Sequence, residues 1–150
     1  MCLYTVAYTR DGSTEIVPAS KEIVPAYKVF TAAEGYAGRT LIIPVFQRVP
    51  EYDLPRDKWL HHYSPASTTI SAVSGQVYPA GWHAYTRLAD AKKQAQCVQS
   101  SNGAFVVVRV LLREVTSEGW EPVGNDIASV AVARYIYIPR NGDLICASLP

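Results

Sequence analysis

Three histidines and three cysteines are the residues of this chain that could hold a metal ion, because zinc prefers imidazole and thiolate ligands. No CxxC or HxxxH spacing occurs, and the adjacent His61 and His62 would point to opposite sides of any strand. The wide cysteine spacing fits reduced thiols better than a disulfide framework. We therefore predict no metal site. The six residues are Cys2, Cys97, Cys146, His61, His62 and His83.

Nucleotide chemistry has partial support in the sequence. The motifs GxGxxG, GxxxxGK[ST] and GxSxG are absent, so no cofactor is predicted. Arg109 and Arg134 stand in otherwise apolar stretches, and together they could grip a phosphate bidentately near Tyr85. An ADP-ribosyltransferase-like enzyme would need a late glutamate such as Glu114 or Glu118, but the Glu-x-Glu pair of such enzymes is missing. A nucleotide-binding or sequestering protein, or such an enzyme, is the alternative interpretation.

The segment of residues 49–74 carries prolines at positions 50, 55 and 65, which disfavour regular secondary structure. A long irregular stretch inside a compact domain is often a functional loop. The chain also has 10 tyrosines and 3 tryptophans, residue types that are enriched at binding surfaces. We predict that a partner binds the aromatic residues of this segment, namely Tyr52, Trp59, His61, His62 and Tyr63.

Alternating and β-branched residues predict the strands that position these groups. Residues 2–9 are expected to form an opening strand or hairpin. Residues 40–47 form a second extended stretch, which Pro44 places at a sheet edge or a bulge because it lacks an amide donor. Residues 105–115 are apolar on both faces, as is typical of a central strand, and residues 127–138 are the expected partner strand.

One helix is predicted, after a short strand at residues 81–85. Thr86 can cap this helix, and its apolar face would carry Leu88, Ala91, Ala95 and Val98. Near the end of the chain, Asn141 and Gly142 favour a tight type I′ hairpin between residues 127–138 and residues 144–147. The expected fold is α+β, a mostly antiparallel sheet with one main helix packed on it and a long irregular middle segment.

The composition is that of an ordinary globular domain. The 150 residues, 49% of them hydrophobic, fit a single domain over residues 1–150. The formal net charge of +1 lacks the basic excess that nucleic-acid binding usually needs. No apolar run approaches the roughly 20 residues that cross a bilayer, and no secretory leader is recognisable. We therefore expect a cytoplasmic protein that binds neither membranes nor nucleic acid directly.

Three short aromatic elements follow one another along the chain, at residues 1–5 (MCLYT), 27–30 (YKVF) and 81–85 (GWHAY), the last ahead of the Ala/Lys helix. In their order they resemble a family of small phage-encoded proteins, in which a Val-rich strand and a final strand follow the helix. Small phage proteins often bind and block a host or defence component. The resemblance therefore implies a non-enzymatic inhibitor, of the anti-CRISPR or another anti-defence type, that acts on a bacterial host protein in the cytoplasm and supplies no catalytic residues.

Overall fold

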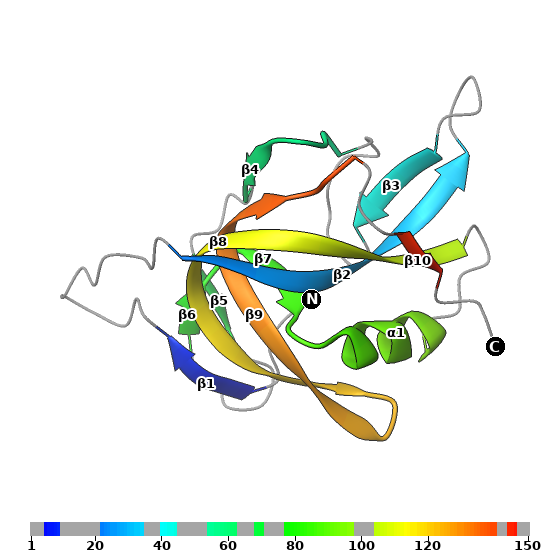
Figure 1. Ribbon diagram of the computed structural model, residues 1–150. Coiled ribbons are helices and arrows are strands. Elements are labelled where there is room, and N and C mark those ends of the chain that lie inside the picture. The colour runs from blue at the N-terminus through cyan, green and yellow to red at the C-terminus, as the bar shows by residue number, and fades with distance from the viewer. Residues whose placement is uncertain are drawn as a thin grey trace.

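The computed structural model describes residues 5–9, 22–34, 40–44, 54–62, 68–70, 77–97, 104–140 and 144–146. In these ranges the strand pairings are antiparallel and one helix accompanies the sheet (Figure 1), so the prediction of a mostly antiparallel α+β fold is confirmed. The elements are β1 (Thr5–Thr9), β2 (Ile23–Glu34), β3 (Thr40–Pro44), β4 (Trp59–His61), β5 (Thr68–Ile70), β6 (Val77–Pro79), β7 (Trp82–Tyr85), α1 (Leu88–Cys97), β8 (Ala104–Val123), β9 (Asp126–Tyr137) and β10 (Leu144–Cys146).

The long strand β8 organises the main sheet. It pairs with β2 over residues 104–113 and with β9 over residues 111–123. β9 also pairs with β7, and β7 meets β2 at the single pair Tyr27–Tyr85. The four strands therefore close on themselves in a ring, which Figure 1 shows as a strongly curved sheet.

β8 bends in its middle. Glu114 has a φ of 59°, and the pairing with β9 shifts register between Val115 and Ser117. An extra residue in one strand of an antiparallel pair is a β-bulge, which bends the strand and increases its twist. β8 then continues to Val123, where a two-residue turn begins with Gly124 at a φ of 59°. A glycine in this first central position is what a type II′ hairpin requires.

Apolar side chains pack on both sides of the sheet. One cluster joins residues of several strands, among them Phe30, Trp82 and Ile136. The other lies against α1, whose Ala91 and Ala95 are buried in it, so this part of the predicted helix face is confirmed. No helix in the described ranges is long and apolar enough to cross a membrane.

The prediction of an edge position for Pro44 is confirmed. β3 pairs with β2, where Pro44 lies opposite Phe30. Among the strands that the structure describes, no second one pairs with β3. Because proline has no amide to donate, the outer side of the sheet is where it costs least.

Three details of the sequence prediction are wrong. Thr86 does not cap α1, because the helix begins at Leu88 and the Thr86 hydroxyl donates to the Ser129 carbonyl oxygen at 3.4 Å. β10 pairs with β8 and not with β9, so it is not the second arm of a hairpin from β9; the Asn141-Gly142 turn itself lies outside the described residues. The middle segment is not irregular throughout, because it contains β4 and β5.

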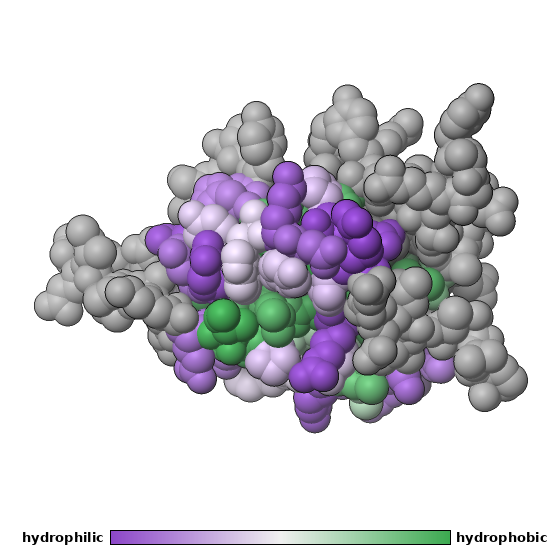
Figure 2. Space-filling view, turned by 45° about the horizontal axis from the view of Figure 1, so that its top comes forward, coloured by the Kyte–Doolittle hydropathy of each residue, from purple (hydrophilic) through white to green (hydrophobic). Residues whose placement is uncertain are grey.

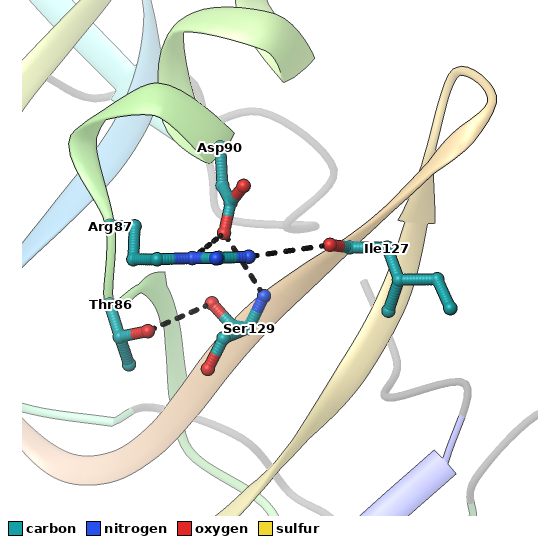
Figure 3. Close-up of polar contacts among 5 residues, drawn as sticks. All are labelled: Thr86, Arg87, Asp90, Ile127 and Ser129. Atoms are coloured by element: carbon teal, nitrogen blue, oxygen red, sulfur yellow. Dashed lines mark hydrogen bonds and ion pairs between the residues drawn. The ribbon is translucent and has the colours of Figure 1, made fainter.

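The start of α1 is tied to β9 by a small polar network (Figure 3). The Asp90 carboxylate accepts a hydrogen bond from Arg87 Nε at 2.8 Å and another from the Ser129 amide at 3.2 Å. Arg87 also donates to the Ile127 carbonyl oxygen at 3.5 Å. Asp90 lies in the first helical turn, where a negative charge is favoured by the exposed amides of the helix.

Substitution of Asp90 by alanine is expected to lower the free energy of unfolding by about 1–2 kcal/mol, because it leaves the Ser129 amide without its carboxylate acceptor. Asp90→Asn keeps an acceptor and should recover part of this loss. The Arg87 side chain is 62% exposed, so Arg87→Gln should cost less than about 0.5 kcal/mol. Urea unfolding of the three variants measures these differences. An equal loss in Arg87→Gln and Asp90→Ala would assign the effect to the surface ion pair.

Candidate functional site

An exposed set of side chains lies on one side of four neighbouring strands, β2, β8, β9 and β4. We call it the platform. Residues directly opposite each other in antiparallel strands lie on the same face of a sheet. The strand register defines two such rows across the four strands. The first row is Ile23, Arg113, Tyr135 and His61, and the second row is Pro25, Leu111, Tyr137 and Trp59.

The alternation of side chains explains why the platform forms. The residues between the platform positions point to the other face and belong to the apolar core, for example Leu112, Ile136 and Leu60. Each platform residue is at least partly exposed, and Ile23 is 52% exposed. Figure 2 shows one face of the molecule, on which a hydrophobic area adjoins weakly and strongly hydrophilic residues.

The aromatic rings of the platform contact one another across the strands. The ring centroids of Trp59 and Tyr137 are 5.5 Å apart, and those of His61 and Tyr135 are 5.0 Å apart. Both pairs are tilted, as aromatic pairs prefer. These contacts restrain the side chains before any partner arrives, so less rotamer freedom remains to be lost on binding.

Arg113 is the positive charge at the centre of the platform. Its Cζ atom lies 4.6 Å from the ring centroid of Trp59 and 4.5 Å from that of Tyr135, so the guanidinium makes cation–π contacts with both rings. None of the ion pairs between described residues includes Arg113. A guanidinium presents five N–H donors at its edge, which match a carboxylate or phosphate. Arg113 is therefore a fixed cation whose planar edge is suited to an anion.

The structure separates the residues that the sequence assigned to partner binding. Trp59 and His61 are part of the platform. His62 points to the other side of β4, where its ring packs at 5.6 Å and nearly perpendicular to that of Trp82. This confirms that the adjacent histidines face opposite ways. Tyr52 and Tyr63 lie outside the described residues.

The three residues predicted for an anion or nucleotide lie in different surroundings. Tyr85 is 2% exposed and its hydroxyl donates to Glu121. Arg109 is exposed on β8, and Tyr27 lies between it and Tyr85 in the register. The Arg134 guanidinium lies 3.8 Å from the Glu114 carboxylate. Five positions of β8, about 17 Å, separate Arg109 from Glu114, so the register does not bring the two arginines side by side.

A second group of polar side chains is buried between β2, β6, β7 and β8. His83 Nδ1 donates to the Gly81 carbonyl oxygen at 3.1 Å, and Nε2 accepts from the Tyr78 hydroxyl at 3.1 Å; we assign this tautomer from the two partners, because a carbonyl oxygen can only accept. The Lys28 ammonium donates to the His83 carbonyl oxygen at 2.7 Å. We call this group the buried polar cluster, and its members are Lys28, Tyr78, His83, Tyr85 and Glu121.

Burial controls the charge states in and around this cluster. It lowers the pKa of Lys28 to about 8, against the attraction of Glu121, and lowers the pKa of His83 to about 3, an effect that Lys28 reinforces. Burial also raises the pKa of Glu121, while the hydrogen bond from Tyr85 and the charge of Lys28 oppose that rise. The pKa of His62 is lowered by burial and then by the charge of Lys28.

The hydrogen bonds of the buried polar cluster run between strands. Lys28 joins β2 to β7, and Tyr85 joins β7 to Glu121 of β8. Buried polar groups that are fully paired specify one arrangement of the elements around them. We interpret the cluster as a structural one that fixes β7 within the ring. In the described part of the chain, no three His, Cys, Asp or Glu side chains come together in a way that could hold a metal ion.

Sequence reasoning missed most of the platform. The sequence predicts Arg113 to lie in a central strand that is covered on both faces. It predicts Tyr135 and Tyr137 to lie in the partner strand of that central strand. The signal that could have found them is the spacing of two residues, which Tyr135 shares with Tyr137 and Arg113 with Leu111. Two-residue spacing puts side chains on one face of a strand.

The chain was compared with protein-family models, curated proteins and solved structures, and no match was found in any of the three.

Proposed function

We propose that this protein is a non-enzymatic binding protein that holds a partner protein on the platform, and that it inhibits a bacterial host or defence component. The observation that carries the proposal is the in-register exposure of four rings and one arginine on neighbouring strands. Tryptophan, tyrosine and arginine dominate the residues whose truncation costs most at protein interfaces. The anti-defence role is supported by the resemblance to small phage-encoded proteins.

The platform has the composition of an interface centre. Trp59, Tyr135 and Tyr137 provide large rings with few rotatable bonds, so their contact area costs little conformational entropy. Ile23 and Leu111 add apolar area at the β2 side of the same face. A polar partner surface with an acidic group would complete the pairing with Arg113. Binding of this kind needs neither a nucleophile nor a general base on the platform.

Loss of the Trp59 side chain or of the Arg113 side chain is expected to weaken partner binding at least tenfold, or about 1.4 kcal/mol, as at the centres of other protein interfaces. The tagged protein is used to capture a partner from a bacterial lysate, and the captured protein is then purified and its affinity measured for the Trp59→Ala and Arg113→Gln variants. Arg87→Gln is the control, because the Arg87 side chain is 62% exposed and lies beside Ile127, at the other end of β9 from Tyr135. Thermal unfolding of each variant checks that the fold is kept.

Two results would contradict the proposal. The first is a captured partner that binds Trp59→Ala and Arg113→Gln as tightly as the unchanged protein. The second is a loss of binding in Arg87→Gln equal to that in Arg113→Gln, which would show a general effect of charge and not a contact on the platform.

A further inference from the structure

The edge of β4 has backbone groups that can pair with another strand. β4 lies at the end of the strand order of the main sheet, and within the described residues only β9 pairs with it. The His62 amide donates to the Arg134 carbonyl oxygen at 2.9 Å. This bond identifies which residues of β4 direct their backbone groups toward β9. In an antiparallel ladder alternate residues direct their N–H and C=O groups to the partner and the others direct them away. The amides and carbonyls of Trp59 and His61 therefore point away from β9.

The side chains at this edge indicate what an added strand would carry. A strand placed beside β4 would set every second side chain next to Trp59 and His61, on the platform face. Arg113 belongs to β8, yet its guanidinium reaches across β9 to within 4.6 Å of the Trp59 ring. It thus offers its donors close to the edge strand.

Among the described residues, the charge at this edge is positive. Lys58, directly before β4, is exposed. The acidic neighbour Asp57 is engaged by Arg140, whose Nε lies 3.4 Å from the carboxylate, and the Arg140 amide donates to the same carboxylate at 2.7 Å. No described carboxylate pairs with Arg113. An acidic side chain is the complement of this arrangement.

Building on the proposed function, we propose that the partner contributes an extended acidic segment that adds to the edge of β4 as a further strand. Its main chain would bond to the outward amides and carbonyls of Trp59 and His61. A glutamate or aspartate on the platform side would accept from Arg113. Main-chain bonds then supply affinity and the carboxylate supplies selectivity, which is how strand addition recognises peptides elsewhere.

The test selects displayed random peptides of about ten residues, the upper range of strand length, on the full-length protein. We expect the selected peptides to carry acidic residues at alternate positions. Replacing these by glutamine, or Arg113 by glutamine in the protein, should weaken binding about tenfold, the loss typical of one charge-assisted hydrogen bond. N-methylation of the peptide at the backbone positions that face β4 should abolish binding. Fluorescence anisotropy measures each protein–peptide pair, and Arg87→Gln is the control.

The proposal is overturned if no peptide is enriched or if the enriched peptides are not acidic. It is also overturned if neither Arg113→Gln nor N-methylation of the peptide weakens peptide binding. The proposed function is judged separately, by whether the captured protein partner depends on the platform. A partner that requires Trp59 but is not displaced by an acidic peptide would leave the platform as the interface and exclude strand addition. Displacement of the partner by a selected acidic peptide would support both.

Discussion

Acidification from pH 7 to pH 5 is expected to lower the free energy of unfolding by about 2 kcal/mol through His83 alone. The His83 side chain is buried, and its pKa in the fold is about 3, because burial penalises the imidazolium and Lys28 repels it. Protonation would also place a proton on Nε2, which already accepts from the Tyr78 hydroxyl. In the unfolded chain the imidazole titrates near 6.5.

The direction follows from the number of protons that each state binds. Between pH 6.5 and about 3 the unfolded chain carries a proton at His83 and the folded chain does not, so stability falls as the pH falls through this window. The full loss is on the order of 5 kcal/mol and is reached only below pH 3. His62, whose pKa is also lowered, acts in the same direction. Glu121 acts in the opposite direction, because the pKa of this carboxyl is raised and the fold gains stability when it takes up its proton.

Urea unfolding at pH 7, 6 and 5, followed by tryptophan fluorescence, measures the change. His83→Gln is the informative variant. It should be less stable than the unchanged protein at pH 7, because glutamine does not reproduce both ring hydrogen bonds, but its stability should change by about 2 kcal/mol less between pH 7 and 5. An identical pH dependence in the two proteins would show that His83 is not the group that titrates.

Substitution of Gly81 by alanine is expected to lower stability by about 3 kcal/mol or more, at the upper end of the cost of overpacking. A Cβ atom at this position would lie 2.6 Å from the Ala133 carbonyl oxygen and 2.8 Å from Val132 Cγ1. The carbonyl belongs to the backbone of β9, so a rotamer change cannot relieve the contact. β7 and β9 would have to move apart where Trp82 pairs with Ala133.

Thermal unfolding measures this effect, and a midpoint lowered by roughly 6–12 °C is expected for a chain of this size. Gly124→Ala is the matched control. Gly124 has a φ of 59° and is exposed in the hairpin turn, so alanine there meets only the backbone cost of a positive φ, about 1–3 kcal/mol. A smaller loss in Gly81→Ala than in Gly124→Ala would contradict the predicted contact with β9.

Local patterns in the sequence predicted the regular parts of the fold and missed the parts that depend on distant contacts. The strand at residues 105–115 was predicted from its apolar run, but β8 continues to Val123 through polar residues. Thr116 and Ser117 lie there in a bulge, and Glu121 is buried because Tyr85, 36 positions earlier, donates to it. A polar residue in a strand looks like the residue of a loop until its partner is known.

Only the β4 part of the candidate site was predicted. Trp59 and His61 were found because they stand in an aromatic cluster of the sequence. Their neighbours Tyr135 and Arg113 come from strands more than 50 residues later, and only the register of β4 on β9 and of β9 on β8 brings them together. Register is set by the packing of whole strands, so a single sequence does not specify these neighbours.

The length of β8 also has a consequence for the order of events during synthesis. β1 and β2 leave the ribosome before β8, yet their described partners include β8, which ends at Val123. The pairs Thr5–Trp120 and Ile23–Arg113 span most of the chain. Contacts between such distant residues slow folding, because a long loop must close before they form. We expect β1 and β2 to stay incompletely paired until β8 has emerged through Val123, and a nascent chain halted before β8 to remain open to proteases and chaperones.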